Sequence, residues 1–552
     1  MKPVRTRSLF WWVILALLSG GGICRADDPQ DLRSLAVQTG ALSSPVKLTE
    51  FLTAHPEAAK AADRYSGFTL LHDAAMDGGD KRFALVQALL DRGADINAAS
   101  REGITPLREA MRYNRRDIGE FLVAKGAYLD VFSACALKNR ARVAQLLQEN
   151  PKLVSARDEY GWTPLWWALD ADAMDIAELL LAKGADVNAK EEPDPKEHWP
   201  NGETPIFRVI RGERLDQVKF LIAHGADLNV QERSNNYTPL LETNLYGRQP
   251  QIFALLLEHG ADPNLPNSQG LTPLHMARTA EDAALLIAHG AKVDVRDKLG
   301  RTPLFTCQSP EIAVFLVEHG ADVNARANDR STPLFWAGSK AISEYLLSKG
   351  ANLHALTRGG STPLHTAAGS RHPDLVEYLI AQGLDVNARN YQGRTPLFQA
   401  AASNDKAMVE LLVARGADIN VKDAQGETSI HSIAPDTPAG KEIAAFLLSK
   451  GAEADIFAAI ILGMTDRVAA LLKADPRLAN AMTPHRRTAL HIAAESGNKE
   501  IVALLLESGA DVHAGDPFHY GATAISLTRD HKEVADLLLA WEKSHPAPPK
   551  PR

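Results

Sequence analysis

A short motif, Thr-Pro-Leu or a close variant, returns at nearly regular intervals along the chain. Its best copies begin at Thr105, Thr163, Thr204, Thr238, Thr272, Thr302, Thr332, Thr362 and Thr395, and weaker copies begin at Thr69, Thr428, Thr488 and Thr523. Most intervals lie near 33 residues, two are about twice as long, and three successive ones, from Thr272 to Thr362, are 30 residues. A period of roughly 20 to 50 residues indicates an array of repeats rather than independent domains.

The residues of each copy predict a pair of helices. Threonine followed by proline suits a helix N-cap and the first helical position, where the missing N–H of proline is not needed. Leucine and two alanines then supply one apolar face, as in residues 363–368, and residues 375–380 form a second apolar pattern ended by glycine. Residues 385–393 lead into a projecting hairpin-like loop. No single pair can bury its apolar face, so neighbouring pairs must stack.

Some copies have lost the threonine motif but keep the helical patterns, at residues 131–147 and 455–472. Each is followed by a similar turn, at 149–153 and 474–478, and residues 54–58 repeat this turn near the start. We therefore predict divergent repeats near residues 31–66, 128–158 and 454–486, and about sixteen repeats in all. Such an array leaves almost no room for a separate catalytic domain.

A period near 33 residues that carries Thr-Pro-Leu-His-x-Ala, as at residues 362–367, resembles the ankyrin-repeat family. The resemblance extends from about residue 31 to residue 540. It implies an all-α solenoid of about sixteen helix-pair repeats with projecting hairpin loops over residues 27–540.

The two ends of the chain differ from the array. Lys2, Arg5 and Arg7 precede an apolar run at 9–18 and then small residues up to Ala26, which is the order found in a secretory signal peptide. We expect cleavage after Ala26 and export to the periplasm or the medium of a bacterium. An uncleaved membrane anchor and lipidation at Cys24 are the alternatives. Residues 541–552 are rich in proline and predict a disordered tail.

The charge balance limits the class of partner. The chain has 60 basic and 68 acidic residues, a net charge of -8. An acidic protein with no evident basic stripe is not expected to bind nucleic acid or an anionic membrane. We expect acidic and polar loop tips to select a protein partner.

Two cysteines remain beyond the signal segment, Cys135 and Cys307. At roughly 10 Å per stacked helix layer they should lie ~50 Å apart, whereas a disulfide needs Cα atoms within about 7 Å of each other. We predict two free, buried thiols.

Resemblance to the ankyrin family implies that partners bind the concave face made by the loop tips and the first helices. The residue after the histidine position of the motif should point to that face, and aromatic side chains are enriched in binding hot spots. The predicted partner-binding residues are Trp167, Arg208, Glu242, Met276, Trp336 and Gln399, with Trp199 in an unusually long loop. Each tryptophan could instead pack against its own repeats.

The histidine position itself is expected to be structural. The family resemblance implies that His72, His275, His365, His431 and His491 form hydrogen bonds between repeats, and that aromatic rings replace these bonds by packing at Trp166, Phe207, Phe305, Phe335 and Phe398. No metal site is predicted.

The sequence carries no phosphate-binding loop, nucleophile elbow, zinc-protease motif, Cys-x-x-Cys pair or dinucleotide-binding turn. We therefore predict a non-catalytic scaffold or inhibitor that binds a protein and needs no cofactor. The alternatives are an accessory or chaperone-like subunit that supports a periplasmic enzyme, and an enzyme with its site on the loops near His198.

Overall fold

The structure of the chain is a computed structural model that describes residues 32–77, 79, 81–191, 202–245, 247–433, 437–483, 487–515, 522–528 and 531–546. The predicted signal peptide (1–26), the loop with His198 and Trp199, and the end of the tail lie outside these residues. Within the described ranges the secondary structure is helical, apart from two isolated β-bridges, Ala62 with Thr69 and Met482 with Thr488. The predicted all-α fold class is confirmed.

The chain divides into two units, Met1–Ala261 and Asp262–Arg552. The helices of unit 1, in which η denotes a short 3-10 helix, are α2 (Leu32–Gln38), η1 (Ala41–Ser43), α3 (Pro45–Ala54), η2 (Pro56–Ala59), α4 (Leu70–Met76), α5 (Arg82–Asp91), α6 (Pro106–Arg112), α7 (Arg116–Ala124), α8 (Val131–Ala136), α9 (Arg140–Glu149), η3 (Pro151–Ser155), α10 (Pro164–Asp170), α11 (Met174–Ala182), α12 (Pro205–Arg211), α13 (Leu215–Ala223), α14 (Pro239–Glu242) and α15 (Pro250–Glu258).

The helices of unit 2 are η4 (Pro273–Met276), α16 (Ala280–Ala288), α17 (Pro303–Thr306), α18 (Pro310–Glu318), η5 (Pro333–Trp336), α19 (Lys340–Ser348), α20 (Pro363–Ala368), α21 (Pro373–Ala381), α22 (Pro396–Ala402), α23 (Lys406–Ala414), η6 (Ser429–Ser432), α24 (Pro438–Ser449), α25 (Ile456–Ile461), α26 (Thr465–Ala474), η7 (Pro476–Asn480), α27 (Ala489–Ser496), α28 (Lys499–Glu507), η9 (Ala524–Leu527) and α29 (Lys532–Ser544). Helix α29 continues four residues past the predicted end of the array at 540.

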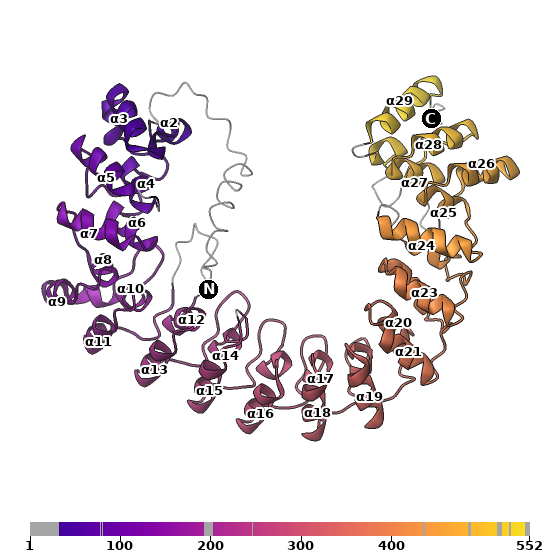
Figure 1. Cartoon of the computed structure of the whole chain (residues 1–552), viewed down its shortest axis with the longest axis horizontal. Helices are drawn as coiled ribbons and strands as arrows, with labels where there is room; N and C mark the ends of the chain where they lie inside the picture. Colours follow the sequence, from indigo (N-terminus) through magenta and orange to yellow (C-terminus); the bar gives the residue numbers. More distant parts are fainter. Residues whose placement is uncertain are drawn as a thin grey trace, which may run out of the picture. The chain divides into compact units, whose positions relative to one another are not determined.

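Within each unit the helices form two rows (Figure 1). In unit 1, α4, α6, α8, α10, α12 and α14 contact one another in succession and form the first row, and α5, α7, α9, α11, α13 and α15 form the second. In unit 2 the first row runs from η4 through α17, η5 and α20 to η9, and the second runs from α16 to α29. Every repeat therefore gives one helix to each row.

The Thr-Pro motif starts the first-row helices as predicted. In α20, Thr362 is the extended N-cap residue and Pro363 is the first helical residue. The divergent repeats use aspartate in place of threonine, since the side chains of Asp130 and Asp455 accept the backbone N–H groups of Ser133 and Ala458. A carboxylate at the N-cap satisfies the same free amide, so these repeats keep the helix start without the motif.

The core lies between the two rows. In one repeat, Leu364, Ala368, Val376 and Leu379 are at most 1% exposed. Small alanines in the first helix let the second helix approach closely, and the leucines and valines fill the remaining space. This pattern recurs along each unit and is the reason why the period can be found in the sequence.

The three intervals of 30 residues have a visible structural cause. Their first-row elements, η4, α17 and η5, contain four residues each, whereas α22 contains seven. The second helices begin directly afterwards, capped by the side chains of Thr279, Ser309 and Ser339. The three missing residues therefore shorten both the first helix and the link between the two helices. Shortening was expected at the link alone.

A ladder of asparagine side chains connects consecutive repeats at the turn after each second helix. Nδ2 of Asn387 donates to the carbonyl oxygen of Gly416 at 3.0 Å, and its Oδ1 accepts the N–H of Asp418 at 2.8 Å. The same two bonds are formed by Asn188, Asn264, Asn324, Asn420 and Asn480. The ladder fixes the distance between neighbouring turns.

Candidate functional site

A histidine brace joins two repeats wherever histidine occupies the fourth position of the motif. The N–H of Thr69 donates to Nδ1 of His72 at 3.1 Å, and Nε2 of His72 lies 2.9 Å from the carbonyl oxygen of Ile104 in the next repeat. Because Nδ1 accepts, Nε2 carries the proton and donates it to this carbonyl. The same contacts occur at His275, His365 and His491. The predicted structural role is confirmed in these four repeats.

The charge state of the braces follows from their surroundings. Burial lowers the pKa of His72, His275 and His365 and keeps these rings neutral. Nε2 of His431 instead lies 3.0 Å from a side-chain oxygen of Asp455. Burial opposes a charge on His431, but the hydrogen bond and the charge of Asp455 outweigh it and raise the pKa of the ring.

The brace changes where an aromatic ring replaces histidine. The rings of Trp166, Phe207, Phe305, Phe335 and Phe398 are buried. In the same repeats the buried cap hydroxyls have no hydrogen-bond partner within the described residues, and they belong to Thr163, Thr204, Thr302, Thr332 and Thr395. An unpaired buried hydroxyl costs about 1–3 kcal/mol. The packing of the rings must offset this cost in each repeat.

The predicted partner-binding residues fall into groups of different exposure. Trp336 and Gln399 are exposed, Arg208 and Met276 are half-buried, Trp167 and Glu242 are buried, and Trp199 lies outside the described residues. The expectation that Trp167 and Glu242 face solvent on the binding side is wrong, for reasons that lie in their neighbours.

Trp167 is covered by other aromatic rings. Only 3% of it is exposed, and its indole Nε1 donates to Oδ2 of Asp158 at 2.8 Å. The ring of Trp162 lies 5.9 Å from that of Trp167 and stacks on Trp166 at 5.8 Å, with an interplanar angle of 10° for the stacked pair. Trp167 is therefore part of the core of unit 1.

Two carboxyl groups next to this aromatic cluster have raised pKa values. Burial, together with the charge of Glu159, raises the pKa of Asp158 to about 6. Glu191 accepts the indole N–H of Trp162 at 2.6 Å, and burial followed by the charge of Glu203 raises its pKa to about 7. Both groups gain charge as the pH rises toward neutrality.

Two arginines near this aromatic cluster pair with carboxylates of the same unit. The guanidinium of Arg211 lies 2.5 Å from carboxylate oxygens of both Glu203 and Glu242. Arg208 pairs with Asp170 at 2.6 Å. Glu242 is thus a buried partner of Arg211, which explains why it does not reach solvent.

Trp336 occupies the same motif position as Trp167 but is 48% exposed. Its indole N–H donates to the hydroxyl of Ser331 at 3.2 Å, and that hydroxyl donates to Asp329 at 2.6 Å. The ring is held in one orientation with nearly half of its surface free. This is the geometry expected of a preformed contact residue.

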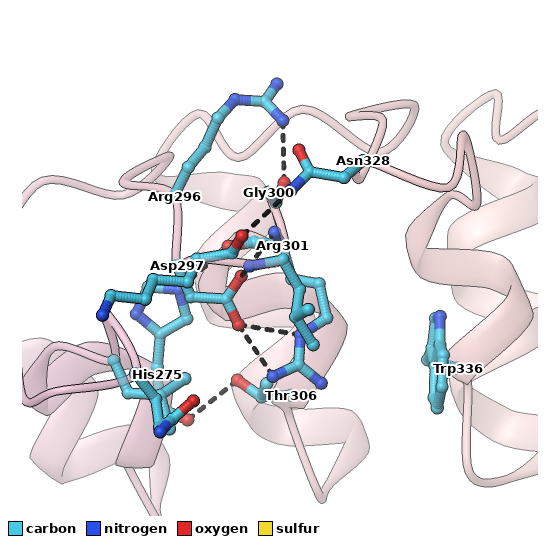
Figure 2. A network of polar contacts seen from close by, with 12 residues as sticks. His275, Arg296, Asp297, Gly300, Arg301, Thr306, Asn328 and Trp336 are labelled. Atoms are coloured by element: carbon cyan, nitrogen blue, oxygen red, sulfur yellow. Dashed lines mark hydrogen bonds and ion pairs between the residues drawn. The ribbon is translucent and has the colours of Figure 1, made fainter.

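The loop before each motif threonine is braced by its own polar residue. Oδ1 of Asp297 accepts the N–H groups of Leu299 and Arg301, and its Oδ2 accepts the guanidinium of Arg301 at 2.8 Å. Figure 2 shows this network next to His275, with the ring of Trp336 set apart from it. The loop at residues 296–301 is therefore ordered by internal bonds.

We define the finger of a repeat as the six residues before its motif threonine. Four successive fingers of unit 2 (296–301, 326–331, 356–361 and 389–394) contain eight basic and two acidic residues, a net charge of +6, and we call them the basic finger row. The fingers at 63–68, 99–104, 157–162 and 232–237 contain four basic and five acidic residues. The expectation that the chain lacks a basic stripe is wrong for the basic finger row.

The basic finger row escaped the sequence analysis because its residues are dispersed. No single finger of the row has a net charge above +2, and the charges gather only when the fingers are stacked. Alignment of the repeats on their threonines would have found them, since positions six and four residues before threonine hold the exposed residues Arg296, Lys298, Arg326, Arg358 and Arg389.

The two thiols are free, as predicted. Cys135 is fully buried, and burial raises its pKa strongly. Cys307 is only half-buried, which corrects the expectation of complete burial, and burial raises its pKa to about 11. Neither thiol is poised to ionise at neutral pH.

Among the described residues, no three His, Cys, Asp or Glu side chains are grouped so that they could hold a metal ion. Across the same ranges, the helices are too short or too polar to span a bilayer.

Comparison with known proteins matches this architecture. The sequence profile described as "Ankyrin repeats (3 copies)" matches residues 35–133, 131–191, 191–267, 244–327, 277–357, 309–390, 334–423, 431–516 and 456–546.

Three relatives show how far the similarity extends. A segment of 117 residues is 32% identical to an ankyrin repeat and KH domain-containing protein of Caenorhabditis briggsae, and it covers 19% of this chain and 4% of that protein. Another segment of 119 residues is 30% identical to alpha-latrocrustotoxin-Lt1a of Latrodectus tredecimguttatus, and it covers 20% of this chain and 8% of that protein. The third segment, of 191 residues, is 27% identical to E3 ubiquitin-protein ligase XB3 of Oryza sativa, and it covers 31% of this chain and 41% of that protein.

The chain thus spans less than half the length of each of these relatives, and what it shares with them is the repeat. The helix pairs, the Thr-His braces and the nearly continuous profile matches agree, and the chain belongs to the ankyrin-repeat family.

Proposed function

We propose that this chain is an exported, non-catalytic scaffold or inhibitor that binds a protein partner through the first-row helices and fingers of unit 2. Ankyrin repeats generally mediate protein–protein interaction, and the fold is typically a non-catalytic scaffold. The observation that carries the proposal is Trp336, whose ring is 48% exposed although its indole N–H is bonded to Ser331. An exposed tryptophan in a fixed orientation loses little conformational freedom on binding.

The surroundings of the two tryptophans favour unit 2 over unit 1 as the partner-binding surface. The tryptophan at the equivalent position of unit 1 is buried, and its neighbouring arginines Arg208 and Arg211 are paired with carboxylates. Gln399, also exposed, lies four repeats along the first row from Met276, and Trp336 lies midway, two repeats from each. We assign the contact surface to the positions of Met276, Trp336 and Gln399.

The first experiment is a crosslinking pull-down of the tagged full-length chain from its native envelope fraction. Trp336→Ala should lose the captured partner, while Tyr128→Ala, which removes an exposed aromatic ring of unit 1, should keep it. Capture that is unaffected by Trp336→Ala contradicts the assigned surface. Constant co-purification of one enzyme at equal stoichiometry would favour an accessory or chaperone-like subunit of that enzyme.

Export is part of the proposal and rests on the basic, apolar and small residues of the first 26 positions. Cell fractionation and the mass of the isolated protein test it. A product that begins at Asp27 in the soluble envelope fraction agrees with cleavage after Ala26. A full-length product in the cytoplasm contradicts it, and a full-length product in the membrane indicates an uncleaved anchor.

A further inference from the structure

We propose that the basic finger row binds an extended, acidic segment of a protein, with the ring of Trp336 against an apolar side chain of that segment. The inference rests on the proposed function and adds the chemical class of the partner.

The positive charge of the row is available to a partner. Arg296, Lys298, Arg326, Arg330, Arg358 and Arg389 are all exposed. The two half-buried arginines of the row are paired, Arg301 with Asp297 and Arg394 with Asp423 of the next finger, so the available charge is that of the six exposed residues.

The hydrogen bonds of these arginines leave their charge uncompensated. Arg296 donates to the carbonyl oxygens of Gly300 at 2.8 Å and of Arg326 at 2.5 Å. Arg389 donates to the carbonyl oxygen of Lys422 at 2.6 Å. A carbonyl is neutral, so these bonds fix the guanidinium groups in place and keep their attraction for a carboxylate.

The backbone of Arg330 is an independent indication that its side chain has a role beyond folding. Residues two positions before the motif threonine adopt a left-handed backbone, with φ of 77° at Gly300, 77° at Gly360 and 76° at Gly393. The finger next to Trp336 has Arg330 at this position, with φ of 67°. A non-glycine residue is disfavoured there, and such strain tends to occur at functional positions.

The fingers are linked into one ordered row. The N–H of Lys298 donates to the carbonyl oxygen of Gln269 at 3.0 Å, and that of Asn328 donates to Leu299 at 2.8 Å. Two further bonds of this kind join Arg358 to Asp329 at 2.5 Å and Tyr391 to Gly359 at 2.9 Å. A partner meets charges whose backbone positions are already set, so little ordering opposes binding.

The spacing of the row favours an extended partner. Stacked helices lie roughly 8–10 Å apart, and an extended chain rises about 3.3 Å per residue. One finger therefore corresponds to about three residues of an extended segment. Four fingers would be matched by a segment of about ten to twelve residues with an acidic side chain at every third position.

Apolar groups among the charges favour a protein over a polyphosphate. Leu299, Leu356 and Tyr391 are exposed in the row at 57%, 41% and 74%. Side chains of a peptide can cover these groups, whereas a phosphate backbone cannot.

The test is fluorescence anisotropy of the full-length chain with a labelled peptide of about twelve residues that has glutamate at every third position and one leucine. Added salt should weaken binding. Arg326→Glu with Arg358→Glu should lower the affinity about tenfold or more, because two attractions become repulsions. Arg330→Gly should weaken binding about threefold while the unfolding midpoint rises or stays unchanged, so a folding defect cannot explain the loss.

The matched control is Arg233→Glu, which reverses an exposed finger charge of unit 1 and should leave the affinity unchanged. A peptide with the same composition but its glutamates in one block should bind more weakly. Three results overturn the proposal: no binding of the spaced peptide at low salt, equal loss with Arg233→Glu, or tighter binding of single-stranded DNA or of vesicles containing phosphatidylglycerol.

The outcome can be separated from that of the proposed function. A partner captured through Trp336 together with no binding of the acidic peptide would uphold the function and reject the acidic segment. Peptide binding without capture of any envelope protein would uphold the acidic segment and reject the assigned scaffold role.

Discussion

Trp167 and Trp336 stand at the same position of the repeat, directly after the histidine position, yet 3% of one and 48% of the other is exposed. The difference comes from the residue just before the motif threonine. In unit 1 this residue is Trp162, whose ring covers Trp167, whereas in unit 2 it is Ser331, which is too small to cover Trp336. We therefore expect this one neighbouring side chain to decide whether the residue lies in the core or at the surface.

The hydrogen-bond acceptors of the two indoles also differ between the core and the surface. Trp167 donates to Asp158, a buried carboxyl whose pKa is raised to about 6, and Trp336 donates to an uncharged hydroxyl. In unit 1 the aromatic and acidic residues at this place therefore belong to the core. In unit 2 the tryptophan and the exposed finger charges remain accessible to a partner.

Truncation of each tryptophan should give the largest contrast. Trp167→Ala removes a buried ring and leaves Asp158 without its indole donor, so we expect a loss of about 3–5 kcal/mol in the free energy of unfolding of unit 1. Trp336→Ala should change the free energy by less than about 1 kcal/mol. Urea unfolding followed by circular dichroism measures both. Equal losses in the two variants would show that exposure does not separate the two sites.

Removal of the covering ring sharpens the same contrast. Trp162→Ser gives Trp167 the neighbour that Trp336 has, and we expect a loss of about 2 kcal/mol together with exposure of the Trp167 ring. With 5-fluorotryptophan incorporated, the 19F resonance of Trp167 should acquire the solvent isotope shift that Trp336 shows from the start. An unchanged Trp167 resonance would mean that another group protects the ring.

The two regions should respond to pH in opposite directions. The folded-state pKa values of Asp158 and Glu191 are raised, so their contribution to stability is complete below their ordinary values near 4 and is lost as the pH rises through about 6 and 7. The pKa values of His275 and His365 are lowered, so their contribution is complete above about 6.5 and is lost on acidification.

Amide hydrogen exchange, corrected for the intrinsic effect of pH, can follow both regions in one sample. From pH 5 to pH 8, protection around 158–191 should fall by about 1 kcal/mol after allowance for partial solvent screening. Over the same range, protection around 272–301 and 362–394 should rise. Glu191→Gln retains an acceptor for the indole of Trp162 and should reduce the slope in unit 1 alone. Parallel slopes in the two regions would contradict this account.

A smaller effect distinguishes repeats with a histidine brace from repeats with an aromatic ring. Thr362→Val removes a hydroxyl that contacts His365 and should cost about 1 kcal/mol. Thr395→Val removes a buried hydroxyl that has no partner and should be neutral or slightly stabilising. The midpoints of chemical unfolding provide the comparison. A greater loss at Thr395 than at Thr362 would refute the pairing.

Much of the fold could be predicted from the sequence because each repeat is stabilised by the same interactions between residues close together in the chain. The cap at Thr362, the first helical Pro363 and the brace of His365 follow from a few adjacent residues. Burial of Trp167 could not be predicted this way, since it depends on the ring of Trp162 and on packing between repeats. The basic finger row was missed because its charges are about 30 residues apart in sequence, and the asparagine ladder was missed for the same reason.

The backbone bonds between fingers also have a mechanical consequence. Each finger donates to the finger before it, so from Gln269 to Ala424 the links point the same way and are loaded in series when unit 2 is stretched. A single hydrogen bond ruptures at lower load than a packed pair of helices unfolds. We therefore expect that, under load, unit 2 first lengthens by breaking the hydrogen bonds between neighbouring fingers while the helix pairs stay folded. It should return to its original length when the load is removed, without any repeat having to refold.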